Sequence, residues 1–220
     1  MVLVKVCGIT NLDDALAAVD AGADALGFNF YLRSPRYVTP EAARAIIDRL
    51  SGVGSPDLLT VGVFVNESLD AIKKIAVVAG VSALQLHGNE PPEYCKALED
   101  YYVIKVFSAG EEFAPDTVLD YDVQAIMLDA VDREKFGGTG KLSNWALARE
   151  TRELFPTLFL AGGLSAENVA EAINQVTPYA VDACSRLESV PGRKDHTRMR
   201  AFVAAVRAAT SSVQRNSSDA

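Results

Sequence analysis

The chain has 220 residues, 49% of them hydrophobic and 23% charged, which is ordinary for a soluble protein with a full-sized core. The formal net charge of −8 argues against a nucleic-acid-binding surface, and no apolar stretch approaches the ~20 residues that cross a bilayer. We see no signal peptide, so the three widely spaced cysteines indicate reduced thiols and a cytoplasmic location. The two histidines lie too far apart to suggest a metal site.

The first predicted strand, residues 3–6, is short and apolar, and it stops at Cys7. Thr10 or Asn11 can cap the helix that follows. The Cys7 thiol is therefore expected at the tip of a rigid strand, beside a glycine that lets another molecule approach the backbone. Such a position suits a reactive group, and the alternative is that Cys7 is a small buried hydrophobe.

The same unit then recurs, namely an apolar run, a turn and an amphipathic helix. Further strands are predicted over residues 24–30, 59–65, 82–86, 102–107, 124–128, 157–160 and 179–183. Helices are predicted from residue 12, from a cap and proline at Thr39-Pro40, within 66–79, 91–98, 111–119 and 143–154, from residue 165, and over 195–209.

Eight such units with fully apolar strands predict a single (β/α)8 TIM barrel with parallel strands, an α/β fold. The barrel domain is expected over residues 1–209, and the polar, Ser-rich residues 210–220 are expected to fray. A doubly wound open sheet is the alternative, but the glycine fingerprint of a dinucleotide site is missing after the first strand.

A barrel of this kind keeps its active site at the carboxyl ends of its strands. The residues that the pattern places there are Cys7, Arg36, Asn66, Gln85, His87, Lys105, Phe107, Asp129, Gly162, Gly163 and the stretch 182–186, which contains Asp182, Ser185 and Arg186. The two glycines, followed by a helix from Ser165, could turn backbone N–H groups toward a phosphate. Alternatively they form a tight turn without a ligand.

Residues 137–141, Gly-Gly-Thr-Gly-Lys, do not form a phosphate-binding P-loop. Lys135 stands where that motif needs a glycine, and Leu142 stands where it needs Ser or Thr. We interpret the segment as a flap over the site, with a plain surface loop as the alternative.

Cys7 and Asp129 are expected on opposite sides of one barrel mouth. A thiolate can act as a base and a protonated carboxylic acid as a proton donor, a combination that suits proton transfers on a sugar. This chemistry needs the pKa of Cys7 below ~8.5 and that of Asp129 above ~3.9. The alternatives are a capping or ion-pairing role for Asp129 and a solvated loop cation for Arg36.

Taken together, several short motifs resemble the phosphoribosylanthranilate isomerase family of tryptophan biosynthesis, from Lys5 to about Ala209. They are Lys5-Val6-Cys7-Gly8-Ile9-Thr10, Ser34-Pro35-Arg36-Tyr37, Val61-Gly62-Val63-Phe64-Val65-Asn66, Gln85-Leu86-His87-Gly88, Leu128-Asp129, Gly137-Gly138-Thr139-Gly140, Leu160-Ala161-Gly162-Gly163-Leu164 and Pro191-Gly192-Arg193-Lys194-Asp195.

This resemblance implies an aldose–ketose isomerase that carries out an Amadori rearrangement without a cofactor. Its substrate would be the phosphosugar N-(5-phosphoribosyl)anthranilate, and the enzyme would be a monomer or homodimer. Cys7 would be the general base and Asp129 the general acid. Arg36 would pair with the anthranilate carboxylate, a role that suits a planar guanidinium. Further substrate contacts would come from Gln85, His87, Gly162, Gly163, Asp182, Ser185 and Arg186.

The loop after the eighth strand departs from the family pattern, which usually reads Val-Asp-Val-Ser-Ser-Gly. Here Cys184 replaces a serine and Arg186 replaces a glycine that lies near the expected phosphate. Arg186 could clash with the phosphate or add a cationic contact. Two rival functions stay open. One is a dual-substrate isomerase of histidine and tryptophan synthesis, which uses an aspartate where this chain has Cys7. The other is a non-catalytic barrel that binds a phosphosugar.

Overall fold

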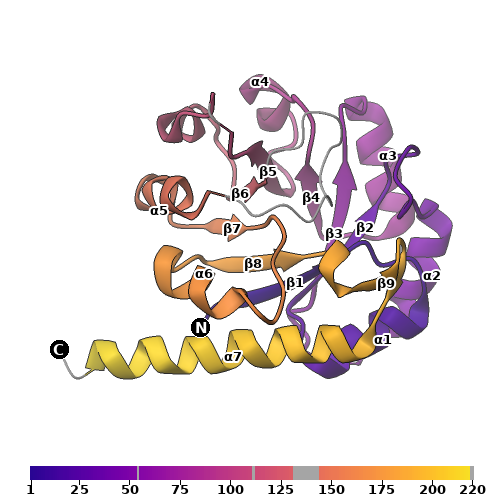
Figure 1. The fold of residues 1–220 in the computed structure, drawn as a ribbon. Helices are drawn as coiled ribbons and strands as arrows, with labels where there is room; N and C mark the ends of the chain where they lie inside the picture. The colour runs from indigo at the N-terminus through magenta and orange to yellow at the C-terminus, as the bar shows by residue number, and fades with distance from the viewer. Residues whose placement is uncertain (54, 111, 131–143, 219–220) are drawn as a thin grey trace.

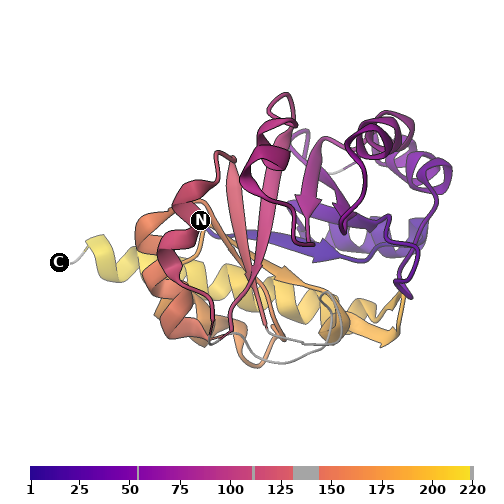
Figure 2. The same cartoon turned by 90° about the horizontal axis from the view of Figure 1, so that it is seen from above.

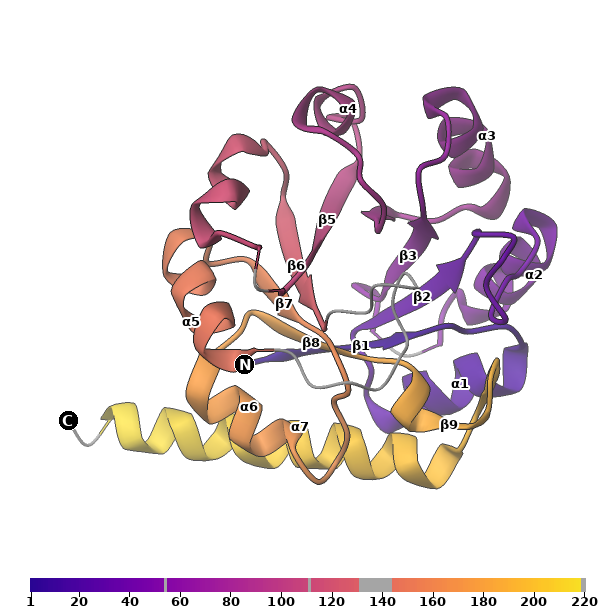
Figure 3. The same ribbon diagram turned by 45° about the horizontal axis from the view of Figure 1, so that its top comes forward.

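Eight parallel strands form a closed barrel in which each strand pairs with the next and β8 pairs with β1 (Figures 1 and 3). The computed structural model describes residues 1–53, 55–110, 112–130 and 144–218. The strands are β1 (Leu3–Cys7), β2 (Ala25–Asn29), β3 (Leu59–Phe64), β4 (Ala83–Leu86), β5 (Tyr102–Ser108), β6 (Ala125–Asp129), β7 (Leu158–Leu160) and β8 (Ala180–Ala183). The predicted (β/α)8 TIM barrel is thus confirmed, and the open-sheet alternative is excluded.

Helices on the outside of the barrel connect successive strands, and η2 and α7 follow the last strand. They are α1 (Leu12–Ala21), α2 (Pro40–Leu50), α3 (Leu69–Ala79), α4 (Pro92–Lys96), α5 (Trp145–Leu154), α6 (Val169–Val176) and α7 (His196–Ser218), with the short 3-10 helices η1 (Pro115–Asp120) and η2 (Ser185–Leu187). A small antiparallel hairpin, β9 (Glu188–Val190) and β10 (Arg193–Lys194), follows η2.

Some predicted boundaries are wrong. The helix expected over 111–119 is the 3-10 helix η1, which begins at Pro115 because proline has no N–H to give inside a helix. The helix expected from Ser165 begins at Val169, because the Asn168 side chain accepts the Ser165 N–H at 2.9 Å and forms a turn first. The last helix continues to Ser218, past its predicted end. The predicted flap over 137–140 lies outside the described residues.

Side chains alternate between the barrel interior and the layer between strands and helices. The interior cluster contains Ala83 of β4, Met127 of β6 and Ala180 of β8, and Leu3 of β1 packs against it. The outer cluster contains their chain neighbours, which pack under the helices. By this alternation, the inward-facing polar side chains toward the carboxyl ends of the strands include Lys5, Cys7, Asn29, Gln85, His87, Ser108, Asp129, Asp182 and Cys184.

The closing helix α7 packs against α1 and α6 and runs along one side of the barrel (Figures 1 and 2). Its Arg207 donates hydrogen bonds to the carbonyls of Val2 (2.9 Å) and Gly22 (2.7 Å) and to the Asp24 carboxylate (2.8 Å). These contacts fasten the helix to the start of the chain. Among the described helices, none is both long and apolar enough to cross a membrane.

Candidate active site

Cys7 is the last residue of β1, and its side chain is 8% exposed at the mouth of the barrel. The neighbouring strand makes room for it with a glycine, because a Cβ on Gly27 would lie 2.7 Å from the Cys7 sulfur. After Gly8, with φ of 78°, the Asn11 side chain accepts the Asp14 N–H at 2.9 Å and starts α1. The Cys7 sulfur is therefore held in place at the end of a rigid strand, as the sequence predicts.

A buried ion pair lies one inward position below the thiol. Lys5 is fully buried, and its ammonium donates to the Asp182 carboxylate at 2.8 Å. Burial alone would lower the pKa of Lys5, but the negative charges of Asp182 and Cys7 outweigh it and raise that pKa. Lys5 therefore keeps its charge and also hydrogen-bonds to the Cys7 sulfur.

The Cys184 thiol follows β8, and its hydrogen-bonding interaction with Cys7 is the main reason that the pKa of Cys7 lies well below its ordinary value. Burial opposes the shift, and the charges of Lys5 and Lys194 reinforce it. Cys7 thus has the environment of a thiolate rather than of an inert buried hydrophobe. The corresponding requirement for Asp129 stays a prediction.

Asp129 ends β6, on the same carboxyl edge of the barrel as Cys7. One carboxylate oxygen accepts the Ala130 N–H at 2.8 Å, and the other lies 3.4 Å from Nε2 of His87. Nδ1 of His87 is 3.1 Å from the amide nitrogen of Gln85. Gln85, His87 and Asp129 therefore form a chain of polar groups along the inner wall.

Arg36 comes from the loop after β2 and reaches across the mouth to Glu188. Its Nε and one terminal nitrogen donate to the two carboxylate oxygens at 2.8 and 2.7 Å. Lys194 donates to Glu188 at 3.1 Å and to the Cys184 carbonyl at the same distance. Arg36 is consequently a fixed member of a charged network and not a solvated loop cation.

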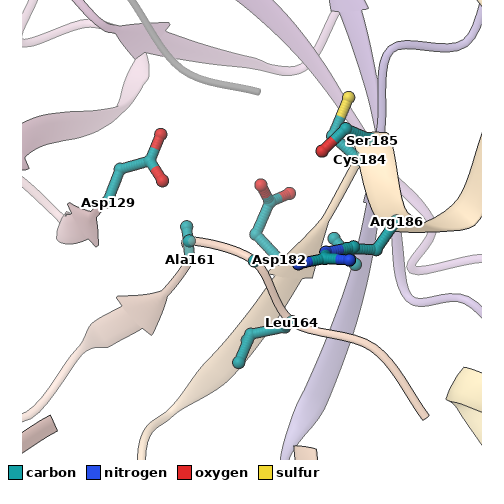
Figure 4. A pocket seen from close by; sticks show the side chains of 10 residues that line it. Asp129, Ala161, Leu164, Asp182, Cys184, Ser185 and Arg186 are labelled. Atoms are coloured by element: carbon teal, nitrogen blue, oxygen red, sulfur yellow. The ribbon is translucent and has the colours of Figure 1, made fainter. Parts of the chain in front are cut away.

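A pocket opens beside Asp129 where the loops after β7 and β8 meet (Figure 4). It is lined by Asp129, Ala161, Gly162, Gly163, Leu164, Asp182, Ala183, Cys184, Ser185 and Arg186. In Figure 4 the carboxylates of Asp129 and Asp182 point into this space. Gly162 has φ of 93°, and a Cβ there would lie 2.7 Å from the Ala130 nitrogen, so only glycine fits this turn. The predicted glycine pair and strand-eight loop thus share one pocket.

Lys105 and Phe107 do not face the mouth, so their nomination from the sequence is wrong. Val106 belongs to the interior cluster, and its neighbours therefore point outward. Lys105 is buried and donates to Glu90 at 2.7 Å and to the Gly88 carbonyl at the same distance. Phe107 stacks edge-on against Tyr121, with ring centroids 5.0 Å apart.

Asn66 lies at the strand-three end but supports the neighbouring loop. Its backbone N–H donates to Glu90 at 2.8 Å, and its side-chain oxygen accepts the Asn89 N–H at 2.7 Å. The charged groups Lys5, Glu188 and Lys194 were not predicted as site residues. Lys5 had a visible signal, since it lies two residues before Cys7 and so shares its face, and Lys194 lies in one of the motifs that carry the family resemblance.

Comparisons with known proteins agree with this geometry. The family model described as N-(5'phosphoribosyl)anthranilate (PRA) isomerase matches residues 4–205. N-(5'-phosphoribosyl)anthranilate isomerase of Syntrophus aciditrophicus is 49% identical over 210 residues, covering 94% of this chain and 88% of that protein. The crystal structure of phosphoribosyl anthranilate isomerase from Thermotoga maritima has a TM-score of 0.86 and 43% identity, covering 94% of this chain and all of that one (100%).

A further solved structure is phosphoribosyl anthranilate isomerase in complex with reduced 1-(o-carboxyphenylamino)-1-deoxyribulose 5-phosphate. It has a TM-score of 0.83 and 42% identity, and covers 94% of this chain and 100% of that chain. Both the match of the family model over most of the sequence and the level of identity are far above what a shared barrel requires. The chain therefore belongs to the N-(5'-phosphoribosyl)anthranilate isomerase family.

Proposed function

We propose that this chain is a phosphoribosylanthranilate isomerase that converts N-(5-phosphoribosyl)anthranilate into 1-(2-carboxyphenylamino)-1-deoxy-D-ribulose 5-phosphate. The observation that supports this most is the pair of titratable groups at one mouth. Cys7 and Asp129 each end a strand and face inward on the same carboxyl edge. Membership of the family and the ligand held by its solved relative support the same substrate.

In the first step Asp129 acts as general acid. It gives its proton to the ring oxygen of the ribose, the bond from C1 to that oxygen breaks, and the lone pair of the anthranilate nitrogen forms an iminium ion. Asp129 is suited to this because His87 and the Ala130 N–H hold its two oxygens in place. Depending on the tautomer of His87, Nε2 can donate to the carboxylate or accept from the acid.

In the second step Cys7 acts as general base. Its thiolate takes the proton from C2, the electrons of that C–H bond form a C1–C2 double bond, and the iminium becomes an enolamine. Tautomerisation of the enolamine gives the ketone product. The ammonium of Lys5 and the thiol of Cys184 both stabilise the thiolate of Cys7. Cys7 can therefore act as the base without another residue that removes its proton.

The remaining residues hold the two ends of the substrate. Arg36 would bind the anthranilate carboxylate with the donors that Glu188 leaves unused. Gly162, Gly163, Ser185 and Arg186 would surround the phosphate, and Asp182, Gln85 and His87 would contact the sugar between them. A cytoplasmic location and a monomer or homodimer remain our predictions for the protein in the cell.

The test is a turnover assay with the purified chain. Loss of the fluorescence of N-(5-phosphoribosyl)anthranilate should follow saturation kinetics, and chromatography should identify the deoxyribulose product. The Asp129→Asn variant serves as the matched protein control. A rate no higher than that of the substrate alone in buffer would contradict the proposal. Binding of the reduced product analogue without turnover would instead favour a non-catalytic phosphosugar-binding barrel.

A further inference from the structure

The pairing of β1 with β8 brings two cysteines side by side. The register runs from Leu3 opposite Ala180 to Val6 opposite Ala183, where β8 ends, and Cys7 and Cys184 are the residues that directly follow this last pair. Backbones of neighbouring strands lie about 4.8 Å apart, and disulfides join residues whose Cα atoms are about 4.4–6.8 Å apart. Partners in register also point to the same face, here the barrel interior.

The two side chains also lie close together, because each thiol shifts the pKa of the other. The Cys184 sulfur also lies only 3.0 Å from the place where a Cβ on Gly8 would stand, directly after Cys7. The left-handed glycine therefore leaves the space in which Cys184 approaches the catalytic strand.

The two sulfurs differ in how readily they lose their protons. The interaction between the thiols lowers the pKa of Cys7 and raises that of Cys184, so Cys7 is the thiol that ionises first. A thiolate is the form that hydroperoxides oxidise, and a second thiol in contact is the usual partner that resolves the product to a disulfide. Cys184 is partly exposed and lines the open pocket (Figure 4), so a small oxidant that enters the pocket reaches the Cys184 side of the pair.

We propose that Cys7 and Cys184 form a reversible disulfide when the protein meets a hydroperoxide. The Cys7 thiolate attacks the peroxide, the O–O bond breaks, and Cys7 becomes a sulfenic acid while alkoxide, or hydroxide from hydrogen peroxide, leaves and takes a proton from solvent. The Cys184 sulfur then attacks Cys7, and hydroxide leaves with the thiol proton as water. Two thiols are oxidised by two electrons, and the peroxide is reduced. A dithiol reverses the bond by exchange.

The disulfide would stop turnover because its sulfur can no longer take a proton. This consequence rests on the proposed function, whereas formation of the bond does not. The third thiol, Cys95, is a buried residue of α4, and burial raises its pKa to about 11, which makes it an internal reference.

The experiment treats the purified chain with hydrogen peroxide at about one equivalent, unfolds it in denaturant so that all free thiols are blocked, and maps the peptides by mass spectrometry. Of the three thiols, only Cys95 should then be alkylated, and a peptide that links residues 7 and 184 should appear. Turnover should fall with formation of this peptide and return after dithiothreitol. The Cys95→Ser variant should behave in the same way.

The Cys184→Ser variant gives the matched comparison, and Cys184→Ala replaces it if the serine variant folds poorly. Each is compared with its own untreated sample. No linked peptide should form, and excess peroxide should drive Cys7 to the sulfinic acid, so dithiothreitol should no longer restore turnover. Absence of the linked peptide from the oxidised parent chain overturns the proposal. A linked peptide with unchanged turnover supports the bond but overturns the role of Cys7 as the base.

Discussion

Arg36 and Glu188 are joined by two parallel hydrogen bonds, 2.8 Å from Nε and 2.7 Å from a terminal nitrogen. A guanidinium has five N–H donors, so about three remain for a ligand. The pair orients the remaining donors before any substrate arrives, and a planar carboxylate is the ligand that such a fork binds best.

Replacing Arg36 by alanine should weaken substrate binding more than it slows turnover. We expect KM to rise by at least about tenfold, as for the loss of one charge-assisted hydrogen bond of about 1.5–3 kcal/mol, with a smaller change in kcat. Arg36→Lys should recover only part of the loss, because an ammonium cannot form the planar fork. The exposed Arg33 of the same loop provides the control Arg33→Ala. An unchanged KM in Arg36→Ala would rule out the carboxylate contact.

Removing either proton-transfer group should reduce kcat by about 10²–10⁴-fold, the usual contribution of general acid or base catalysis. The changes are Cys7→Ala for the base and Asp129→Asn for the acid. Circular dichroism should show an intact fold in both, since neither group closes the barrel. Cys95→Ala and Asp122→Asn change a cysteine and an aspartate away from the mouth and should keep turnover. Full activity in Cys7→Ala or Asp129→Asn would refute the assigned role.

The pH profile should report the low pKa of Cys7. As pH rises through that pKa the base loses its proton, so kcat/KM should climb on an acid limb that lies below the ordinary cysteine value of about 8.5. Cys184→Ala removes the thiol that contributes most to the shift, and its acid limb should move to higher pH. Cys184→Ser keeps a donor and should move less. Identical acid limbs in the parent chain and Cys184→Ala would contradict this origin of the shift.

Asp14 should contribute to stability in a pH-dependent way. Its carboxylate is buried in α1 and accepts the Lys194 N–H at 2.9 Å, and it lies 2.8 Å from Nε2 of His196. Burial opposes ionisation, but these contacts and Asn11 outweigh it and lower the pKa of Asp14. A lowered folded pKa means that the stabilisation is complete above the unfolded value of about 3.9 and is lost as pH falls through the folded value.

Urea unfolding of Asp14→Ala should therefore show a loss of about 1–3 kcal/mol at pH near 7, the cost of leaving the buried Lys194 N–H without its acceptor. In acid the difference in free energy of unfolding between Asp14→Ala and the parent chain should become smaller. The exposed neighbour provides the control Asp13→Ala, which should stay within about 0.5 kcal/mol. A loss of stability in Asp14→Ala that is equal at both pH values would show that the charge of Asp14 does not cause it.

The alternation of apolar strands and amphipathic helices predicted the barrel, because strands buried on both faces must be parallel and covered by helices. Knowledge of the strand ends was then enough to nominate Cys7, Asp129 and the glycine pair. It was not enough to choose a face: Lys105 and Phe107 also lie toward a strand end, but Val106 between them takes the interior position. A shift of one residue moves every side chain of a strand to the opposite face. A run of apolar residues does not show which of its members face the barrel interior.

By itself, then, the sequence determined the closed ring of strands and the residues at their carboxyl ends, since both depend on periodicity along the chain. Only the tertiary structure decided the partners: Asp182 for Lys5, Glu188 for Arg36, and Cys184 for Cys7. The first two pairs are separated by 177 and 152 residues. They meet because β8 closes against β1, and no local pattern encodes a contact that exists only once the last strand has joined the first.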